Sequence, residues 1–219
     1  MAKKIYLSPS NQDANLYAYG NTNEMVQCNR IAEYARIALQ RCGYEVKKAP
    51  QGQAMSTSIA ESNQWGADLH LPIHTNAFNG KTTGGTLVML YADRTENNKA
   101  GKALLDALSP LSPGSDYSIR YNSGLAELNS TDALAVYLEV EFHDTQEGAK
   151  WITENVKNIG EAIAKGVCAY YGSKYVAEAP ASNSKLYRVQ VGAYSSLANA
   201  EAMQKKLKAA GFDAIIKQG

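Results

Sequence analysis

Short apolar segments alternate with amphipathic helical segments up to Tyr171, and this alternation constrains the fold of the chain more than any other feature. The expected strands are residues 4–7, 44–48, 69–73, 84–91 and 134–140. The first expected helix begins at Thr22 or Asn23 and ends at Gly43. Three further helices are expected over residues 56–66, 97–108 and 147–171. Strands that alternate with helices indicate a mostly parallel sheet. We therefore expect an α/β fold with a central sheet of about six strands, flanked by helices.

Composition limits the classes of protein to which the chain can belong. The 219 residues suit one domain and a smaller second one, and a hydrophobic content of 45% is enough for a real core. With 22 basic and 21 acidic residues, the net charge of +1 does not indicate a nucleic-acid partner. No apolar run approaches the ~20 residues that span a bilayer. The three cysteines (Cys28, Cys42 and Cys168) are widely spaced within helical patterns, which favours reduced core thiols over a disulfide framework or a zinc knuckle.

The C-terminal part of the chain differs in composition. Residues 174–185 contain Ala-Pro-Ala-Ser-Asn-Ser and are predicted to be a polar linker. An alternating strand over 186–194, a helix over 197–210 and a second strand over 212–217 follow. We therefore divide the chain into a first domain (1–173), the linker, and a small β-α-β unit (186–219) that looks like half of a domain.

Two histidines lie on one of the expected strands. His70 and His74 are four residues apart, so both point to the same face, about 13 Å apart at ~3.3 Å per residue. That distance is too long for one metal ion, and we expect His70 to be structural or to support a ligand. His74 is near the carboxyl end of its strand, where open α/β sheets place their chemistry. The commoner fate of such a histidine is a hydrogen-bonded place in the core.

Two carboxylates stand at comparable positions. Glu24 opens a helix, where its charge also suits the helix dipole without any catalytic role. Glu139 ends a buried strand, where an unpaired charge is costly, and this favours a function. Together with His74 they suggest a mixed imidazole and carboxylate zinc site with a separate carboxylate base, although scattered Glu and His residues are common.

Several ordered motifs carry a family resemblance. They are Ile5-Tyr-Leu-Ser-Pro-Ser, Asn23-Glu24, Leu71-Pro-Ile-His-Thr-Asn-Ala77, Gly84-Gly-Thr-Leu-Val and Ala135-Val-Tyr-Leu-Glu-Val-Glu-Phe142. Residues 3–172 resemble the zinc-dependent N-acetylmuramoyl-L-alanine amidases of the family 3 type. The resemblance implies hydrolysis of the amide between N-acetylmuramic acid and the L-alanine of the stem peptide. It also implies that Glu24 and His74 bind Zn²⁺ and that Glu139 is the catalytic general base.

The chain departs from the family pattern at one position. Where the family has Asp-Pro-Gly-His-Gly, this chain has Ser8-Pro-Ser-Asn11-Gln12, so the first zinc-binding histidine is missing. We expect His143 to replace it, in preference to Asn11 or Gln12, because neutral amides are weak zinc ligands. The alternative is a metal-free pseudoenzyme that still binds peptidoglycan.

Substrate contacts are less defined. Glu127 and Asn129 precede the strand of Glu139 and are expected to border the substrate groove, and Asn11 is a further candidate. Residues from Tyr187 to Phe212 resemble the first repeat of a sporulation-related (SPOR) domain, a class that binds glycan strands stripped of stem peptides. Gln190 is the candidate glycan contact.

The expected partner is thus peptidoglycan, with neither a nucleic acid nor a membrane span. Two other functions stay open: a noncatalytic wall-binding protein, and a zinc peptidase that acts within the stem peptide. The N-terminus enters a strand at once and leaves no room for a signal peptide. We expect synthesis in the cytoplasm and action at the cell wall from the mother cell, after lysis, or after release through a pore, as for a phage endolysin.

Overall fold

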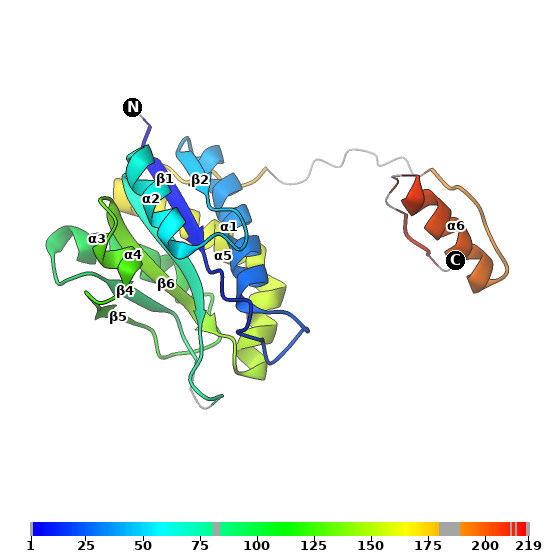
Figure 1. The fold of residues 1–219 in the computed structure, drawn as a ribbon, viewed down its shortest axis with the longest axis horizontal. Coiled ribbons are helices and arrows are strands. Elements are labelled where there is room, and N and C mark those ends of the chain that lie inside the picture. Colours follow the sequence, from blue (N-terminus) through cyan, green and yellow to red (C-terminus); the bar gives the residue numbers. More distant parts are fainter. Residues whose placement is uncertain (1, 81–83, 180–188, 211, 213, 218–219) are drawn as a thin grey trace. The chain divides into compact units, whose positions relative to one another are not determined.

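The computed structural model describes residues 2–80, 84–179, 189–210, 212 and 214–217. The chain divides into two compact units, Met1–Glu178 and Ala179–Gly219 (Figure 1). The first unit extends beyond the boundary expected at residue 173. Arg41 Nε donates to the Val176 carbonyl at 2.7 Å, which ties the end of this segment to the first unit.

The first unit contains one mixed sheet. Its strands are β1 (Lys4–Pro9), β2 (Glu45–Lys48), β3 (Leu69–Asn76), β4 (Leu87–Leu90), β5 (Ser118–Tyr121) and β6 (Leu134–Phe142). Their order is β2-β1-β3-β6-β4-β5, and all neighbours are parallel except β4 and β6, which are antiparallel. The predicted six-stranded, mostly parallel α/β sheet is confirmed. The sequence pattern missed β5 because its four residues, Ser-Ile-Arg-Tyr, are only partly buried or exposed.

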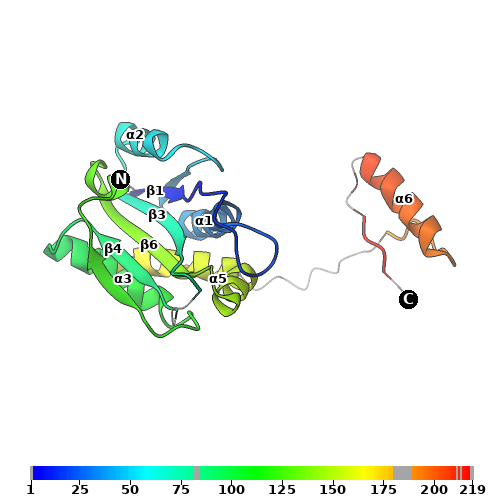
Figure 2. The same ribbon diagram turned by 60° about the horizontal axis from the view of Figure 1, so that its bottom comes forward.

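Helices cover the two faces of the sheet unequally. The helices are α1 (Glu24–Arg41), α2 (Met55–Trp65), α3 (Thr95–Leu108), α4 (Ala126–Asn129) and α5 (Gln146–Tyr171). Figure 2 shows α1, α3 and α5 on one side of the sheet and α2 on the other. The first side, here called the core face, receives the fully buried side chains of Leu7, Leu71 and Leu138.

The opposite side is here called the polar face. Side chains alternate along a strand, so the residues between the core positions point to this face. They include Ser8 on β1, His70 and His74 on β3, and Tyr137 and Glu139 on β6. Its helical cover consists of α2 and the four-residue α4. The sheet therefore separates the apolar core from a buried set of titratable groups.

The start of α1 follows from its capping sequence. Asn23 has an extended backbone, and its Oδ1 accepts a hydrogen bond from Val26 N at 3.0 Å. This cap fixes Glu24 in the first turn, where its side chain is only 1% exposed. The predicted helix start is confirmed. The carboxylate is turned into the protein instead of toward solvent.

Gly160 sets the close packing of α5 against α1. A Cβ atom at this position would lie 2.6 Å from Tyr34 Cβ and 2.7 Å from Ala35 N. We expect Gly160→Ala to lower the free energy of unfolding by about 1–3 kcal/mol, because overpacking forces the helices apart. Urea unfolding monitored by the fluorescence of Trp65 and Trp151 measures this. The exposed substitution Lys157→Ala, one turn earlier, is the control, and an equal effect of both changes would contradict the packing argument.

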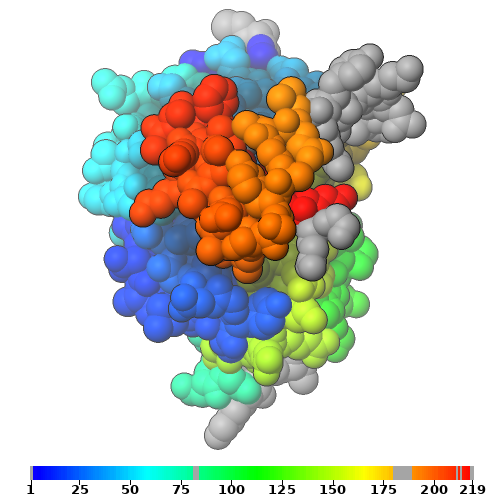
Figure 3. Space-filling view, turned by 90° about the vertical axis from the view of Figure 1, so that its right-hand side faces the viewer, coloured from blue at the N-terminus to red at the C-terminus, as the bar shows by residue number. Residues whose placement is uncertain are grey.

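The second unit contains one described helix, α6 (Leu197–Ala209), which begins where the sequence predicted. The expected strands differ. Residues 186–188 of the first one lie outside the described residues, and residues 189–194, 212 and 214–217 are not in strands. Apolar side chains of this unit are exposed, Val189 by 89%. Figure 3 shows the unit in orange and red. A short β-α-β segment buries too little apolar surface to hold two strands together on its own.

None of the helices in the described part of the chain is both long and apolar enough to cross a membrane.

Candidate active site

A carboxylate and an imidazole meet where the carboxyl end of β3 approaches the start of α1. Glu24 Oε1 lies 2.8 Å from His74 Nδ1, and Asn15 Nδ2 donates to Glu24 Oε2 at 2.7 Å. Both members of the pair are buried. The sequence predicted both residues for one site, and the structure brings them into direct contact.

The pair is strongly polarised. Burial alone would lower the pKa of His74, but the nearby carboxylate of Glu127, the hydrogen bond to Glu24 and the charge of Glu139 raise it to about 9. Burial likewise opposes the charge on Glu24, yet the contact with His74 and the hydrogen bonds from Asn15 and Ser10 hold the pKa of that carboxyl below its usual value. The protein surroundings therefore favour the protonated, positively charged imidazole of His74.

Gln12 adds an amide to this point. Its Nε2 lies 3.4 Å from His74 Nδ1, and its Oε1 accepts from Asn15 Nδ2 at 2.7 Å. A protonated His74 Nδ1 already donates to Glu24, so it cannot accept a hydrogen bond from the Gln12 amide. Turning this amide over would place an oxygen beside Nδ1 and Glu24 Oε1. An imidazole nitrogen, a carboxylate oxygen and an amide oxygen would then share one point.

Glu139 lies next to this pair. It pairs with His74 in the register of β6 and β3, and its Oε2 is buried without a hydrogen-bond partner among the described residues. Burial is the main reason that the pKa of Glu139 is raised to about 7; His74 lowers it and Glu24 raises it. A carboxyl group that titrates near neutral pH suits proton transfer in both directions.

A second buried carboxylate approaches His74 from the other side. Glu127, on α4, accepts hydrogen bonds at Oε1 from Ser8 Oγ and from His70 Nε2, the latter at 3.2 Å. Its Oε2 lies 3.8 Å from His74 Nε2. Burial opposes ionisation, but the hydrogen bond from His70, the nearby imidazole of His74 and the hydrogen bond from Ser8 lower the pKa of Glu127 to about 2. One glutamate thus links both histidines of β3.

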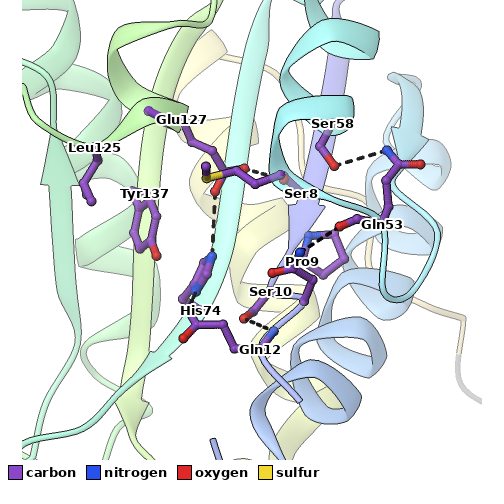
Figure 4. A pocket seen from close by; sticks show the side chains of 13 residues that line it. Ser8, Pro9, Ser10, Gln12, Gln53, Ser58, His74, Leu125, Glu127 and Tyr137 are labelled. Carbon is purple, nitrogen blue, oxygen red and sulfur yellow. Dashed lines mark hydrogen bonds and ion pairs between the residues drawn. The ribbon is translucent and has the colours of Figure 1, made fainter. Parts of the chain in front are cut away.

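These groups open into a pocket on the polar face of the sheet (Figure 4). His74, Glu127 and Tyr137 form one wall, with the Tyr137 ring stacked on His74 at 4.6 Å between centroids. The rest of the lining is mostly small or uncharged, namely Ser8, Pro9, Ser10, Asn11, Gln12, Gln53, Met55, Ser58, Leu125 and Ala126. The pocket therefore gives a neutral polar ligand access to His74.

His143 is not part of this cluster, which corrects the expectation that it would be the third ligand. Its Nδ1 lies 3.0 Å from the Thr75 carbonyl oxygen and 2.9 Å from Thr75 Oγ1, and its ring stacks on Tyr17. Thr75 follows His74, so its side chain points to the core face while His74 points to the polar face. The position of His143 along the sequence did not reveal this change of face.

Of the remaining predicted substrate contacts, one lies in the pocket and two lie elsewhere. Asn11 lines the pocket and donates to the Gln53 carbonyl at 3.1 Å. Asn129 is turned to the Ser123 carbonyl instead, at 2.9 Å. Gln190 is exposed in the second unit. Asn15 was not among the predicted site residues, because it lies in a polar loop without any periodic pattern that would single it out.

The donor set decides whether a metal ion fits. Within the described ranges, no three His, Cys, Asp or Glu side chains form a metal-binding group. Glu24 and His74 supply two conventional zinc ligands at one point, and among the described residues Gln12, with its amide turned over, would place a third and weaker donor beside His74 Nδ1. These residues fit a metal ion with two strong ligands and one weak one.

The fold is a mixed α/β sheet, and its site places a buried carboxyl group that titrates near neutral pH beside a glutamate–histidine pair, an arrangement that suits a hydrolase. Residues 10–169 match the family model for N-acetylmuramoyl-L-alanine amidase, and the chain belongs to this family. Residues 164–219 match the model for the SPOR domain. The predicted order, an amidase domain followed by a SPOR segment, is confirmed.

Individual relatives agree with this assignment. The chain is 25% identical over 227 aligned positions to a sporulation-specific N-acetylmuramoyl-L-alanine amidase of Bacillus subtilis strain 168, with 97% of this chain and 84% of that protein covered. The fold is similar to the catalytic domain of CwlV, an amidase from Bacillus (Paenibacillus) polymyxa var. colistinus (TM-score 0.66, 18% identity, 78% and 99% covered). It is also similar to the catalytic domain of the CD27L endolysin (TM-score 0.61, 24% identity, 75% and 96% covered).

Proposed function

We propose that this chain hydrolyses the amide between N-acetylmuramic acid and the L-alanine of the stem peptide, and that it uses Zn²⁺ to do so. Hydrolysis of peptidoglycan by an amidase follows from the family. The zinc dependence rests on one observation: Glu24 and His74 meet at 2.8 Å beside Glu139, whose Oε2 has no partner among the described residues.

Each residue has a distinct role in this proposal. Glu24, His74 and the Oε1 atom of Gln12 would hold Zn²⁺, which when bound activates water and polarises the scissile carbonyl. Glu139 takes the proton from the attacking water and then gives it to the leaving amine. Its raised pKa, about 7, allows both steps near neutral pH. Asn15 holds Glu24 in place through its Nδ2 atom, whereas its hydrogen bond to Gln12 Oε1 would be lost when that oxygen turns toward the metal.

Gln12 provides the test of the metal site. We expect the purified chain to retain about one zinc per molecule after dialysis. We expect Gln12→His to raise the zinc affinity by at least about tenfold, which corresponds to ~1.4 kcal/mol, because an imidazole replaces a neutral amide. Elemental mass spectrometry and competition with a chelator measure both quantities.

The matched control is the neighbouring Asn11→His. The Asn11 side chain is turned to the Gln53 carbonyl instead of His74, so no gain in affinity is expected. If both changes or neither raised the affinity, Gln12 would not be the third ligand.

A noncatalytic wall-binding protein is the second candidate, favoured by the single observation that, in the part of the chain that the structure describes, no more than two conventional zinc ligands meet. Purified walls separate the functions. Binding without release of stem peptides supports the noncatalytic protein. Released intact stem peptides that begin with L-alanine support the amidase, and fragments cut within the stem support a peptidase. Mass spectrometry of the digest identifies the bond that is cut.

We further propose that the enzyme acts at the cell wall during sporulation, from the mother cell. The similarity to the sporulation-specific amidase and the SPOR match support this setting. Release through a pore, as for an endolysin, is the competing route, and the similarity to the CD27L catalytic domain supports it. Time-resolved detection of the protein during sporulation and after prophage induction distinguishes the two routes.

A further inference from the structure

Glu127 is a buried carboxylate in the lining of the pocket to which the reaction above gives no role. It is 3% exposed and has no basic Lys or Arg partner among its described contacts. Its short helix, α4, lies over β6 on the polar face. Burying a charged carboxylate costs free energy. The groups that stabilise the Glu127 carboxylate therefore indicate its role.

These contacts lead to the second nitrogen of His74. Glu127 Oε1 is anchored by Ser8 Oγ on β1 and by His70 Nε2 on β3. His70 is itself fixed, because its Nδ1 lies 3.0 Å from Ser62 Oγ and its ring stacks on Tyr6. The other oxygen, Oε2, is thereby directed to His74 Nε2, at 3.8 Å (Figure 4). Glu24 and Gln12 contact the other ring nitrogen, Nδ1.

We propose that Glu127 is a positioning residue for His74. It holds the imidazole proton on Nε2 and the ring in the plane that presents Nδ1 to Glu24 and Gln12. A carboxylate on the far nitrogen of a ligand histidine fixes its tautomer and makes it a better electron donor. This role replaces the substrate contact that the sequence suggested for Glu127. It rests on the proposed function, since it requires His74 to bind a metal ion.

The importance of this arrangement follows from the weak third ligand. With an amide at Gln12 in place of an imidazole, His74 supplies the only nitrogen donor in the set. A well-oriented, electron-rich His74 partly offsets the missing histidine. We therefore expect Glu127→Gln, which keeps the size of the side chain and removes its charge, to weaken zinc binding by about 10–100-fold.

The experiment measures zinc affinity of the full chain by chelator competition, separately from turnover. Glu61→Gln is the matched control. Glu61 is a carboxylate of α2 that accepts from Tyr6 Oη and Gln53 without touching His74, and its replacement should leave the affinity unchanged. Nitrogen-15 NMR of the zinc-loaded protein should show His74 as one tautomer, protonated on Nε2, and a tautomer mixture or a displaced ring in Glu127→Gln. Thermal unfolding of both variants confirms that they are folded.

Kinetics at saturating zinc separate the proposed role from a substrate contact. A positioning role predicts a lower kcat with little change in KM. Unchanged zinc affinity and an unchanged His74 spectrum, with a raised KM, would overturn the proposal and make Glu127 a substrate contact. Absence of zinc from the unmodified protein would overturn the metal site and this inference together, whereas zinc binding that ignores Glu127→Gln would overturn this inference alone.

Discussion

Replacing Glu139 with glutamine is expected to lower turnover by about 10²–10⁴-fold, the usual contribution of a general acid–base group. The amide has nearly the same shape but cannot take a proton from water. Glu139 Oε2 has no partner among the described residues, so the change breaks no hydrogen bond of that atom. Release of stem peptides from purified walls measures turnover, and elemental mass spectrometry measures the zinc content, which should stay near one per chain.

The zinc content makes this prediction specific. Loss of zinc together with turnover would make Glu139 a ligand instead of a base, and retained turnover would exclude either role. The exposed residue Glu154 on α5 offers a control, because Glu154→Gln removes the same charge from the same domain far from the polar face. We expect this control to retain both zinc and turnover.

The second large effect is expected for Glu24→Gln. Glu24 is the only anionic member of the proposed ligand set, and it also accepts the hydrogen bonds from Asn15 and His74. Its loss should lower the zinc affinity by more than the ~10–100-fold that is typical when a supporting residue is removed. Turnover should fall in proportion and recover in part at high zinc concentration. Chelator competition and zinc-dependent activity measure these changes.

A charge elsewhere on α1 is the appropriate comparison. Glu33 pairs with Arg36 one turn away at the surface, so Glu33→Gln removes a carboxylate from the same helix without reaching the site. The control should bind zinc like the unmodified chain. Equal zinc affinity in Glu24→Gln and Glu33→Gln would remove Glu24 from the metal site.

Much of the fold was predictable because the spacing of apolar residues along the sequence indicates which segments form the buried strands and helices of the core. Apolar runs separated by helical patterns indicated the buried strands, and the Asn23 cap marked the start of α1. The contact between Glu24 and His74 was also predictable, since the amino end of a helix that follows β1 and the carboxyl end of β3 meet at one edge of a parallel sheet. In this part of the chain, the predicted positions of the strands and helices were enough to predict which side chains lie close together.

The remainder depended on the direction in which single side chains point. His143 follows β6 by one residue, and its ring turns to the face of Thr75, away from His74. Gln12 and Asn15 sit in a loop whose path is set by hydrogen bonds between distant backbone groups, such as Met25 N to the Gln12 carbonyl. Neither hydrophobic period nor spacing carries such information.

The unequal cover of the sheet has an evolutionary consequence. Helices α1, α3 and α5 stabilise the domain from one side. Apart from Glu24 at the start of α1, the site residues His74, Glu127 and Glu139 lie on or over the other side of the sheet. A substitution among those polar groups therefore leaves the apolar packing of the core intact and affects mainly the chemistry of the site. In such a domain a histidine of the site can be replaced by an amide and a neighbouring carboxylate can change, one residue at a time, while the domain remains folded.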